Sequence, residues 1–324
     1  MLPQSPRPPA LGKIVSNTKL PDMPMGALSY GATIHNRKVY ISAFGRDGNG
    51  KHVSPVLVCS TNKHKWSTFP EERSGAAIAV IGNRITLIGG RDVLTRKFNN
   101  THSTWYEENG QWKQVLPPMP TGRYCPAVIS HDNLLLVAGG VAEDKSTVLS
   151  TTDVLDLITN KWTTPERLNL PVPLWRHHLV LCGEYLYLVG GAMVHPWQPP
   201  ENLSFHAWRG KWNDVKQTAA PQHFQPQRGV WTRIAEPPTL CPTPISCEGT
   251  LYTVGGLTRD DTPISTVHKY IPARNQWVSV GDMSVGRVGH CAVPLSSKTI
   301  FVAGGRVVHE GQASYSSLTE HLQL

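Results

Sequence analysis

The stretch LLLVAGG, residues 134–140, is a short apolar run that ends in two glycines. The same phrase returns as ITLIGG, YLYLVGG, TLYTVGG and TIFVAGG, which end at Gly90, Gly191, Gly256 and Gly305. A weaker copy, VYISAFG, ends at Gly45. Successive copies end 45, 50, 51, 65 and 49 residues apart. The chain is therefore built from an internal repeat of about 50 residues.

Each repeat contains three more segments around its glycines. An apolar segment precedes them, such as PAVIS at 126–130, and another follows, such as DVLDL at 153–157. The last segment carries a tryptophan that lies 21 or 22 residues after the glycines in four of the repeats. Alternating and β-branched residues favour strands over helices throughout. Four strands in each repeat predict the blade of a β-propeller.

The repeat resembles the kelch motif. The residues that carry the resemblance are the double glycines, Tyr270 seven residues before Trp277, an arginine that opens the first strand, and the TNKW turn at 159–162. The resemblance covers nearly the whole chain. The sequence departs from it at Phe44-Gly45, which stands where a glycine pair is usual, and at Cys241-Pro242, which stands where an arginine is usual.

We expect an all-β fold, a six-bladed kelch β-propeller with four-stranded blades. Only 19 residues follow Gly305, too few for a complete blade. An N-terminal strand at about 13–20 is therefore expected to complete the last blade, which would remove loose sheet edges. Residues 1–12 are expected to form a proline-rich flexible tail before a propeller at 13–324. The expected blades lie at about 26–69, 73–116, 123–165, 175–236, 241–281 and 287–324.

The longest step between repeats indicates an insertion in the fourth blade, at about 213–230. Two tryptophans could belong to the last strand of that blade. The distance from Gly191 favours Trp212, whereas the distance to Gly256 and the prolines that follow favour Trp231. Trp231 is preferred, but the sequence leaves the choice open.

The repeated glycines and tryptophans are interpreted as structural. A strand near the crowded axis of a ring must turn sharply, which requires positive φ and no Cβ. A phosphate-binding loop would instead open a helix, and no helical pattern follows any of the glycine pairs. The structural positions are Gly45, Gly89, Gly90, Gly139, Gly140, Gly190, Gly191, Gly255, Gly256, Gly304, Gly305, Trp66, Trp112, Trp162, Trp231 and Trp277.

Composition limits the class of protein. The six cysteines have no metal-binding or disulfide spacing, which favours a reducing compartment and a cytoplasmic location. No run of 18 apolar residues exists, so no membrane span is expected. The net charge of +8 permits an acidic partner, but no helix or run concentrates it, so nucleic acid is not expected. We expect a monomer without a metal or another cofactor.

Arginines are expected to gather on one face of the propeller. Arg46, Arg91 and Arg306 follow the glycines, and Arg73, Arg123, Arg176 and Arg287 open first strands, so antiparallel strands would bring all of them to one rim. For the strand-opening arginines, bonding between neighbouring blades is the alternative role. Tryptophans of the fourth blade would add an aromatic patch. The expected partner-binding residues are Arg46, Arg73, Arg91, Arg287, Arg306, Trp175 and Trp197.

The resemblance implies a binding function. Kelch propellers of cullin ubiquitin ligase adaptors bind acidic peptides with arginines on this face, although those adaptors also carry BTB and BACK domains, for which this chain has no room. We therefore expect a non-catalytic protein–protein interaction module that binds an acidic protein segment. The alternative is a propeller enzyme that acts on a sugar-like molecule, as sialic acid epimerases do. No catalytic set can be identified for it. His177-His178 could suggest metal ligands, but adjacent residues of a strand point to opposite faces.

Overall fold

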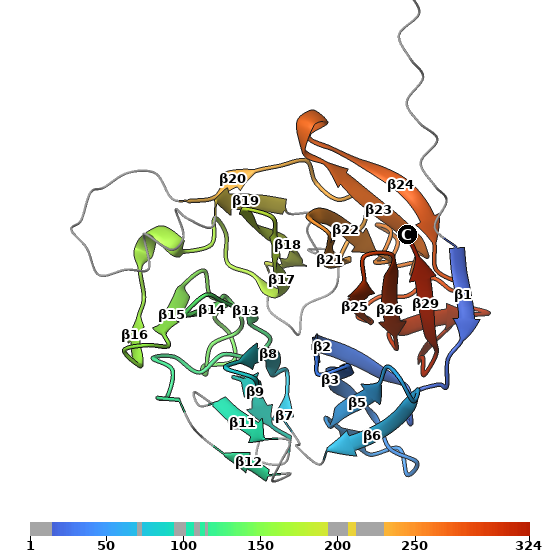
Figure 1. Ribbon diagram of the computed structural model, residues 1–324, viewed down its shortest axis with the longest axis horizontal. Coiled ribbons are helices and arrows are strands. Elements are labelled where there is room, and N and C mark those ends of the chain that lie inside the picture. The colour runs from blue at the N-terminus through green and yellow to red at the C-terminus, as the bar shows by residue number, and fades with distance from the viewer. Residues whose placement is uncertain are drawn as a thin grey trace, which may run out of the picture.

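The computed structural model describes residues 15–69, 73–93, 102–106, 111–113, 116–193, 207–211 and 230–324. Figure 1 shows twisted antiparallel sheets arranged around a central axis, as in a β-propeller. Each sheet is named here by its innermost strand. The innermost strands are β2, β8, β13, β17, β21 and β25. The chain runs outward from each of them through its sheet, except that the outermost strand of the β25 sheet comes from the N-terminus.

Five of these sheets have four strands each. The β8 sheet consists of β8 (Ala77–Ile81), β9 (Arg84–Ile88), β11 (His102–Tyr106) and β12 (Gln111–Lys113). The β13 sheet consists of β13 (Ala127–His131), β14 (Leu134–Ala138), β15 (Thr152–Asp156) and β16 (Lys161–Thr163). The β21 sheet consists of β21 (Thr243–Cys247), β22 (Thr250–Val254), β23 (Thr266–Ile271) and β24 (Gln276–Asp282).

The β2 sheet departs from the repeat and corrects the expectation of six four-stranded blades. Beside five four-stranded sheets, the described residues form this one sheet of five strands. Its strands are β2 (Ala27–His35), β3 (Lys38–Arg46), β5 (Val56–Ser60), β6 (Lys65–Phe69) and the additional β4 (His52–Val53). The weak glycine motif explains the difference. The chain does not turn at Phe44-Gly45, so β3 continues to Arg46 and pairs there with β4.

The β25 sheet joins the two ends of the chain. It consists of β25 (Cys291–Ser296), β26 (Thr299–Ala303), β29 (Thr319–Gln323) and the N-terminal β1 (Val15–Lys19). β1 pairs antiparallel with β29, from Val15 opposite Gln323 to Lys19 opposite Glu320. A hydrophobic cluster that contains Leu57 and Phe301 packs this sheet against the β2 sheet. The first and last sheets of the chain are thus neighbours in the ring (Figure 1).

The β17 sheet contains the longest repeat. Its strands are β17 (Trp175–Cys182), β18 (Tyr185–Ala192), β19 (Ala207–Lys211) and the short outer β20 (Thr232–Arg233). Trp231 directly precedes β20, and its Nε1 donates to the carbonyl oxygen of Leu168 at 3.4 Å. The expected insertion at 213–230 lies almost wholly outside the described residues, as does Trp212.

The remaining elements are small. Two two-stranded sheets add to the larger ones: β7 (Arg73–Ser74) pairs with β10 (Arg91–Asp92), and β27 (Arg306–His309) forms a hairpin with β28 (Gln312–Tyr315). Among the described residues, 3₁₀ helices are found at η1 (Glu166–Leu168) and η3 (Pro272–Arg274). Within the described ranges, no helix has the length and apolar character needed to cross a membrane.

The paired glycines turn the chain as expected, and Gly45 does not. Gly139 and Gly140 have φ of 58° and 92°, in the left-handed region that favours glycine. Gly45 instead lies within extended β3. It is required for close approach, because a Cβ there would lie 2.4 Å from the carbonyl oxygen of Gly26. The expectation of a positive φ is thus wrong at this one position.

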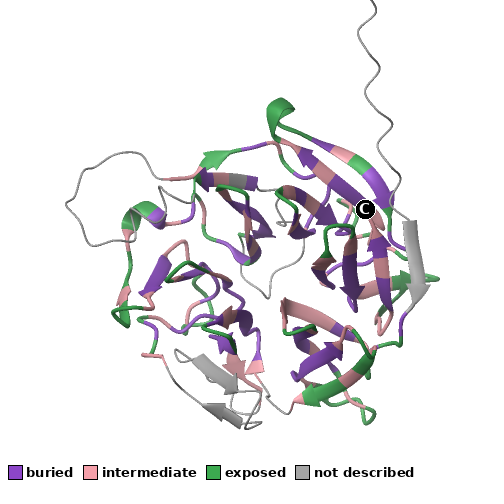
Figure 2. Cartoon of the chain, viewed as in Figure 1, coloured by how far each residue is buried: buried purple, intermediate pink, exposed green. Residues whose placement is uncertain are grey.

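Many residues of the inner strands are buried (Figure 2). Apolar residues pack between neighbouring sheets, and the repeated tryptophans link the outer parts of the sheets. Leu136 and Leu188, for example, belong to one cluster between the β13 and β17 sheets. Nε1 of Trp162 donates to the carbonyl oxygen of Pro117 at 3.0 Å, which lies in the connection from the preceding sheet. Trp66 and Trp277 donate in the same way to Pro21 and Ala235. Trp112 lies in β12, but its side chain is outside the description.

Candidate functional site: the mouth of the axial channel

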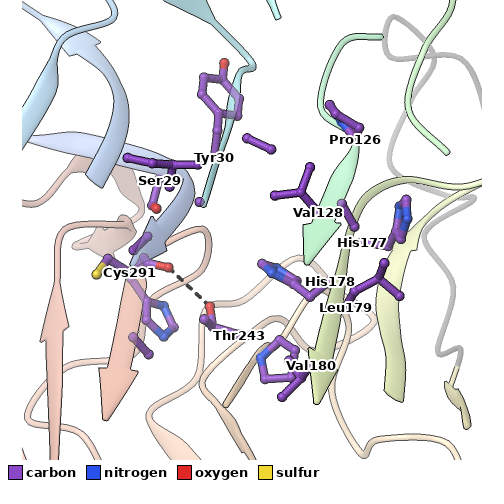
Figure 3. A pocket seen from close by; sticks show the side chains of 18 residues that line it. Ser29, Tyr30, Pro126, Val128, His177, His178, Leu179, Val180, Thr243 and Cys291 are labelled. Atoms are coloured by element: carbon purple, nitrogen blue, oxygen red, sulfur yellow. Dashed lines mark hydrogen bonds between the residues drawn. The ribbon is translucent and has the colours of Figure 1, made fainter. Parts of the chain in front are cut away.

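The innermost strands enclose a channel along the axis of the ring. A cavity of about 160 Å³ lies within it, lined by residues of all the innermost strands (Figure 3). The turns after the glycine pairs and the segments before the innermost strands meet at one end of this channel. Backbone hydrogen bonds join neighbouring sheets at this end. The amide of Cys125 donates to the carbonyl oxygen of Gly75, and the amide of Arg176 donates to the carbonyl oxygen of Cys125.

Two of the expected rim arginines are buried in the structure. Arg123 and Arg287 have no exposed surface. Arg123 binds Asp153 on β15, and its Nη1 donates at 2.9 Å to the carbonyl oxygens of Gly139 and Thr151. Arg287 binds Glu320 on β29 and the carbonyl oxygens of Gly304 and Leu318 in the equivalent way. Each guanidinium thus connects strands of its own sheet.

The prediction that Arg287 is available to a partner is therefore wrong. The sequence analysis considered a bonding role between neighbouring blades for such arginines, and the guanidinium groups instead bond within one sheet. The link to the preceding sheet is made by the backbone: the carbonyl oxygen of Arg123 accepts from the amide of Gly90 at 2.7 Å, and that of Arg287 accepts from Gly256 at 3.1 Å.

Arg176 does not occupy the buried arginine position. In the β17 sheet that position belongs to Leu174, whose carbonyl oxygen accepts from the amide of Gly140 at 2.8 Å. Arg176 lies two residues further on, at a place where its equivalents Gly75 and Gly289 have positive φ. Its own φ is 55°, and its side chain is exposed at the end of the channel. The equivalent Cys125 and Cys241 share this conformation, with φ of 51° and 46°, so the turn belongs to the repeat, and arginine there carries the strain of a side chain with positive φ.

Aromatic rings surround Arg176. Its guanidinium carbon lies 4.8 Å from the ring centre of Trp175 and 5.8 Å from that of Tyr30. Tyr30 is in turn 3.3 Å from Tyr124, hydroxyl to hydroxyl, and the guanidinium carbon of Arg91 lies 4.8 Å from the ring centre of Tyr124. These five residues come from four sheets. We call Tyr30, Arg91, Tyr124, Trp175 and Arg176 the axial-mouth cluster.

A second aromatic group lies next to this cluster. Phe44 stacks on His52 with ring centres 5.1 Å apart, and it also contacts Tyr30 at 6.0 Å and Tyr315 at 6.4 Å. Arg46, on the same strand as Phe44, is exposed. The axial-mouth cluster therefore continues into a partly exposed aromatic surface that has a cationic side chain at its edge.

The other expected site residues differ in accessibility. Arg306 is bound to both carboxylate oxygens of Asp261, at 2.7 and 3.0 Å, and one quarter of its side chain is exposed. Arg73 is half-buried in β7. Trp175 is 8% exposed, because Arg176 and neighbouring apolar residues cover it. Trp197 lies outside the described residues.

The thiols near the mouth are poor nucleophiles. Burial raises the pKa of Cys125 to about 11, although the adjacent Arg176 opposes the rise. Burial likewise raises the pKa of Cys241 to about 11. Both thiols are thus protonated near neutral pH, where a reactive cysteine would be a thiolate. All six cysteines are free.

The histidines along the channel are neutral. Burial lowers the pKa of His178 to about 4, and burial together with Arg287 and His178 lowers that of His290 to about 3. Among the described residues, no group of three or more histidine, cysteine or acidic side chains is arranged to hold a metal ion. The mouth can therefore bind through guanidinium groups, aromatic faces and neutral imidazoles.

Sequence reasoning missed Tyr30 and Tyr124 and omitted Arg176 from its binding set. One signal was present. In most of the segments that lead into an innermost strand the third position is glycine, cysteine or arginine, as in Arg123-Tyr124-Cys125 and Arg287-Val288-Gly289. Aligning Leu174-Trp175-Arg176 with these segments places Arg176 at the exposed third position rather than at the buried first one.

Comparison with known proteins agrees with the fold. The family described as the KLHDC2/KLHL20/DRC7 Kelch-repeats domain matches residues 29–232, and the Kelch motif matches residues 238–284. A solved structure titled "Structure of YjhT" is similar over 91% of this chain and 99% of its own, with a TM-score of 0.68 and 15% identity. That likeness concerns the fold alone.

Curated relatives are longer than this chain. Kelch-like protein 38 of Danio rerio is 23% identical over 260 residues, and Kelch-like protein 35 of Mus musculus is 25% identical over 265 residues. The matches cover 69% and 79% of this chain but only 43% and 39% of those proteins. Alpha-scruin of Limulus polyphemus is 24% identical over 53% of this chain and 20% of its own length. With its family match over most of the chain and its repeated glycine turns, this protein belongs to the kelch-repeat family.

Proposed function

We propose that this chain is a non-catalytic protein-interaction module that captures an acidic segment of a partner protein at the axial mouth, and that it does so as a monomer. The observation that carries the proposal is Arg176. It is a strained, exposed arginine held against two aromatic rings at the point where the sheets converge. Tyr30 and Trp175 contact the guanidinium and Cys125 shares one hydrogen bond with it, so further N–H groups remain for a ligand.

Charge and spacing fit an acidic ligand. Arg46 is exposed at the edge of the aromatic surface, Arg91 covers Tyr124, and the chain carries a net charge of +8. Hydrogen bonds to charged groups contribute about 1.5–3 kcal/mol each. Three such contacts with carboxylates would approach the 8 kcal/mol or so that corresponds to micromolar affinity. Apolar side chains of the partner can pack on Phe44 and His52.

Charge reversal at the mouth tests the proposal. The variant with Arg46→Glu and Arg176→Glu should lose capture of acidic segments from an array of fluorescent peptides, and capture by the parent chain should weaken with added salt. The matched control carries Arg233→Glu and Arg274→Glu, which change the net charge equally at exposed positions away from the mouth. Capture that survives the first pair, or that falls equally with the second, would overturn the proposal.

A further inference from the structure

The axial cavity itself has the features of a small-molecule site. Its volume is about 160 Å³, and it lies directly beneath the axial-mouth cluster, with Tyr30 among its lining residues. Its walls combine apolar side chains, such as Ile78, Val128 and Ala292, with the polar side chains of His178, Thr243 and His290. No lining residue that the structure describes is acidic. A ligand would therefore meet an apolar wall with a few hydrogen-bonding groups.

Two imidazoles supply those groups. His178 points into the cavity in Figure 3 and is half-buried. His290 is 2% exposed, and beyond an interaction with the backbone of Arg287 its ring nitrogens have no hydrogen-bond partner among the described residues. A buried polar group without a partner is costly, so an occupant that accepts or donates a hydrogen bond would be stabilising there.

Arg176 reaches the same channel from its mouth. Its guanidinium carbon lies 5.8 Å from the ring centre of Tyr30, which lines the cavity, and His178 follows two residues later on β17. A ligand that extends from the cavity to the mouth can therefore meet an imidazole inside the channel and a guanidinium at its entrance. Arg123 and Arg287, close to the channel histidines, add positive potential although each is paired.

These features favour a carboxylate over a phosphate. A carboxylate has two oxygens, which one guanidinium and one imidazole can satisfy, whereas a phosphate carries more charge and needs more donors. The apolar wall also suits the carbon skeleton of an organic acid. We propose that the axial channel binds a small organic carboxylate, with its acid group between Arg176 and His178 and its carbon atoms against Ile78, Val128 and Ala292.

The carboxylate could be a free small acid or a side chain of a protein partner. This proposal is independent of the proposed partner capture, because a free acid can enter the axial channel without any partner protein. The test records the imidazole nitrogen resonances of the full chain during titration with isobutyrate. Isobutyramide, of nearly the same shape but uncharged, is the control ligand. His309, exposed at the end of β27, is the internal control.

Saturable shifts of the His178 and His290 resonances are expected with isobutyrate, with no change in those of His309 and none with isobutyramide. The variant His178→Leu, which removes the N–H but keeps a similar volume, should weaken isobutyrate binding about tenfold, as expected for one charge-assisted hydrogen bond. Shifts that never saturate, shifts that occur equally with isobutyramide, or unchanged isobutyrate affinity of a folded His178→Leu variant, followed at His290, would overturn the proposal.

A second titration, with the peptide acetyl-tetraglutamate amide, distinguishes the two sources of the carboxylate. Shifts of His178 with both ligands, and competition between them, would show that a partner's side chain enters the channel. Shifts with isobutyrate alone would assign the site to free acids. Failure of every acidic peptide to bind would overturn the proposed partner capture and would leave the isobutyrate result standing.

Discussion

Arg123 donates two hydrogen bonds to the carboxylate of Asp153, from Nε at 3.0 Å and from Nη2 at 2.8 Å, and both side chains are buried. The same carboxylate accepts from Thr164 through its other oxygen at 2.8 Å. The pair joins the segment before β13 to β15, so one ion pair connects the innermost strand of the sheet to its third strand. Arg287 and Glu320 repeat this arrangement in the β25 sheet.

Removing one partner of this pair should destabilise the protein strongly. Arg123→Met would leave the Asp153 carboxylate buried without its cation, and loss of one member of a buried pair typically costs about 3–5 kcal/mol. Urea denaturation followed by tryptophan fluorescence measures the change. The control Arg233→Met breaks the exposed pair of Arg233 with Glu236 and should have little effect. Equal effects of the two substitutions would contradict the structural role of Arg123.

Acid should destabilise the fold through its buried histidines. Burial, with His178 and Arg123 adding to it, lowers the pKa of His177 to about 3, and that of His290 is also about 3. Their folded pKa lies below the unfolded value of about 6.5. Their contribution is therefore fully present above about pH 6.5 and is lost as pH falls toward 3. Each histidine should remove up to about 1.4 kcal/mol per pH unit over that range.

Two variants isolate this effect from other acid-sensitive groups. The unfolding free energy of the double variant His177→Asn and His290→Asn should fall less steeply between pH 6.5 and pH 4 than that of the parent chain, whatever its absolute stability. His309→Asn, at an exposed position, should keep the parental slope. A double variant with the parental slope would show that these histidines do not titrate as the structure implies.

The repeat was predictable from the sequence because its signals are local. Glycine pairs such as Gly139-Gly140 turn the chain after each second strand, and Trp162 follows at a nearly constant distance because every sheet has the same outer geometry. The fifth strand of the β2 sheet was not predicted. The departure at Phe44-Gly45 was visible, but its consequence depends on pairing with residues further along the chain.

The site was harder to predict because it depends on contacts between distant residues. The burial of Arg123 follows from Asp153, 30 residues away, and that of Arg287 follows from Glu320, 33 residues away. Whether an arginine is buried or exposed at the mouth depends on a shift of two residues in register. That shift is set by the bond from the amide of Gly140 to Leu174 in the next sheet.

The N-terminal strand should be required for stability. Deleting residues 1–22 removes β1, exposes the edge of β29, and removes the buried Leu20 and the carbonyl oxygen of Pro21 that Trp66 binds. Loss of the leucine alone is worth about 1.5–3 kcal/mol, and an open strand edge also favours aggregation. Thermal unfolding should show a clear decrease in Tm. Deleting residues 1–10, which removes no part of β1, is the control, and equal stability of the two truncated chains would contradict this role.

Arg176 should contribute to binding and not to stability. Arg176→Gly relieves the left-handed strain at φ 55°, which stabilises the folded state by about 1 kcal/mol. The same substitution removes the contacts with Tyr30 and Trp175 and increases the conformational freedom of the unfolded chain, and both of these effects are destabilising. The unfolding free energy should therefore change by less than about 1 kcal/mol. Arg176→Ala is the matched variant, because it loses the same guanidinium but keeps the strain. It should be less stable than the glycine variant, and both should lose acidic-peptide capture to the same extent. Urea denaturation measures the stability of both variants, and the peptide assay measures their binding. Strong destabilisation of both variants would show that the arginine is needed for the fold and would contradict this prediction.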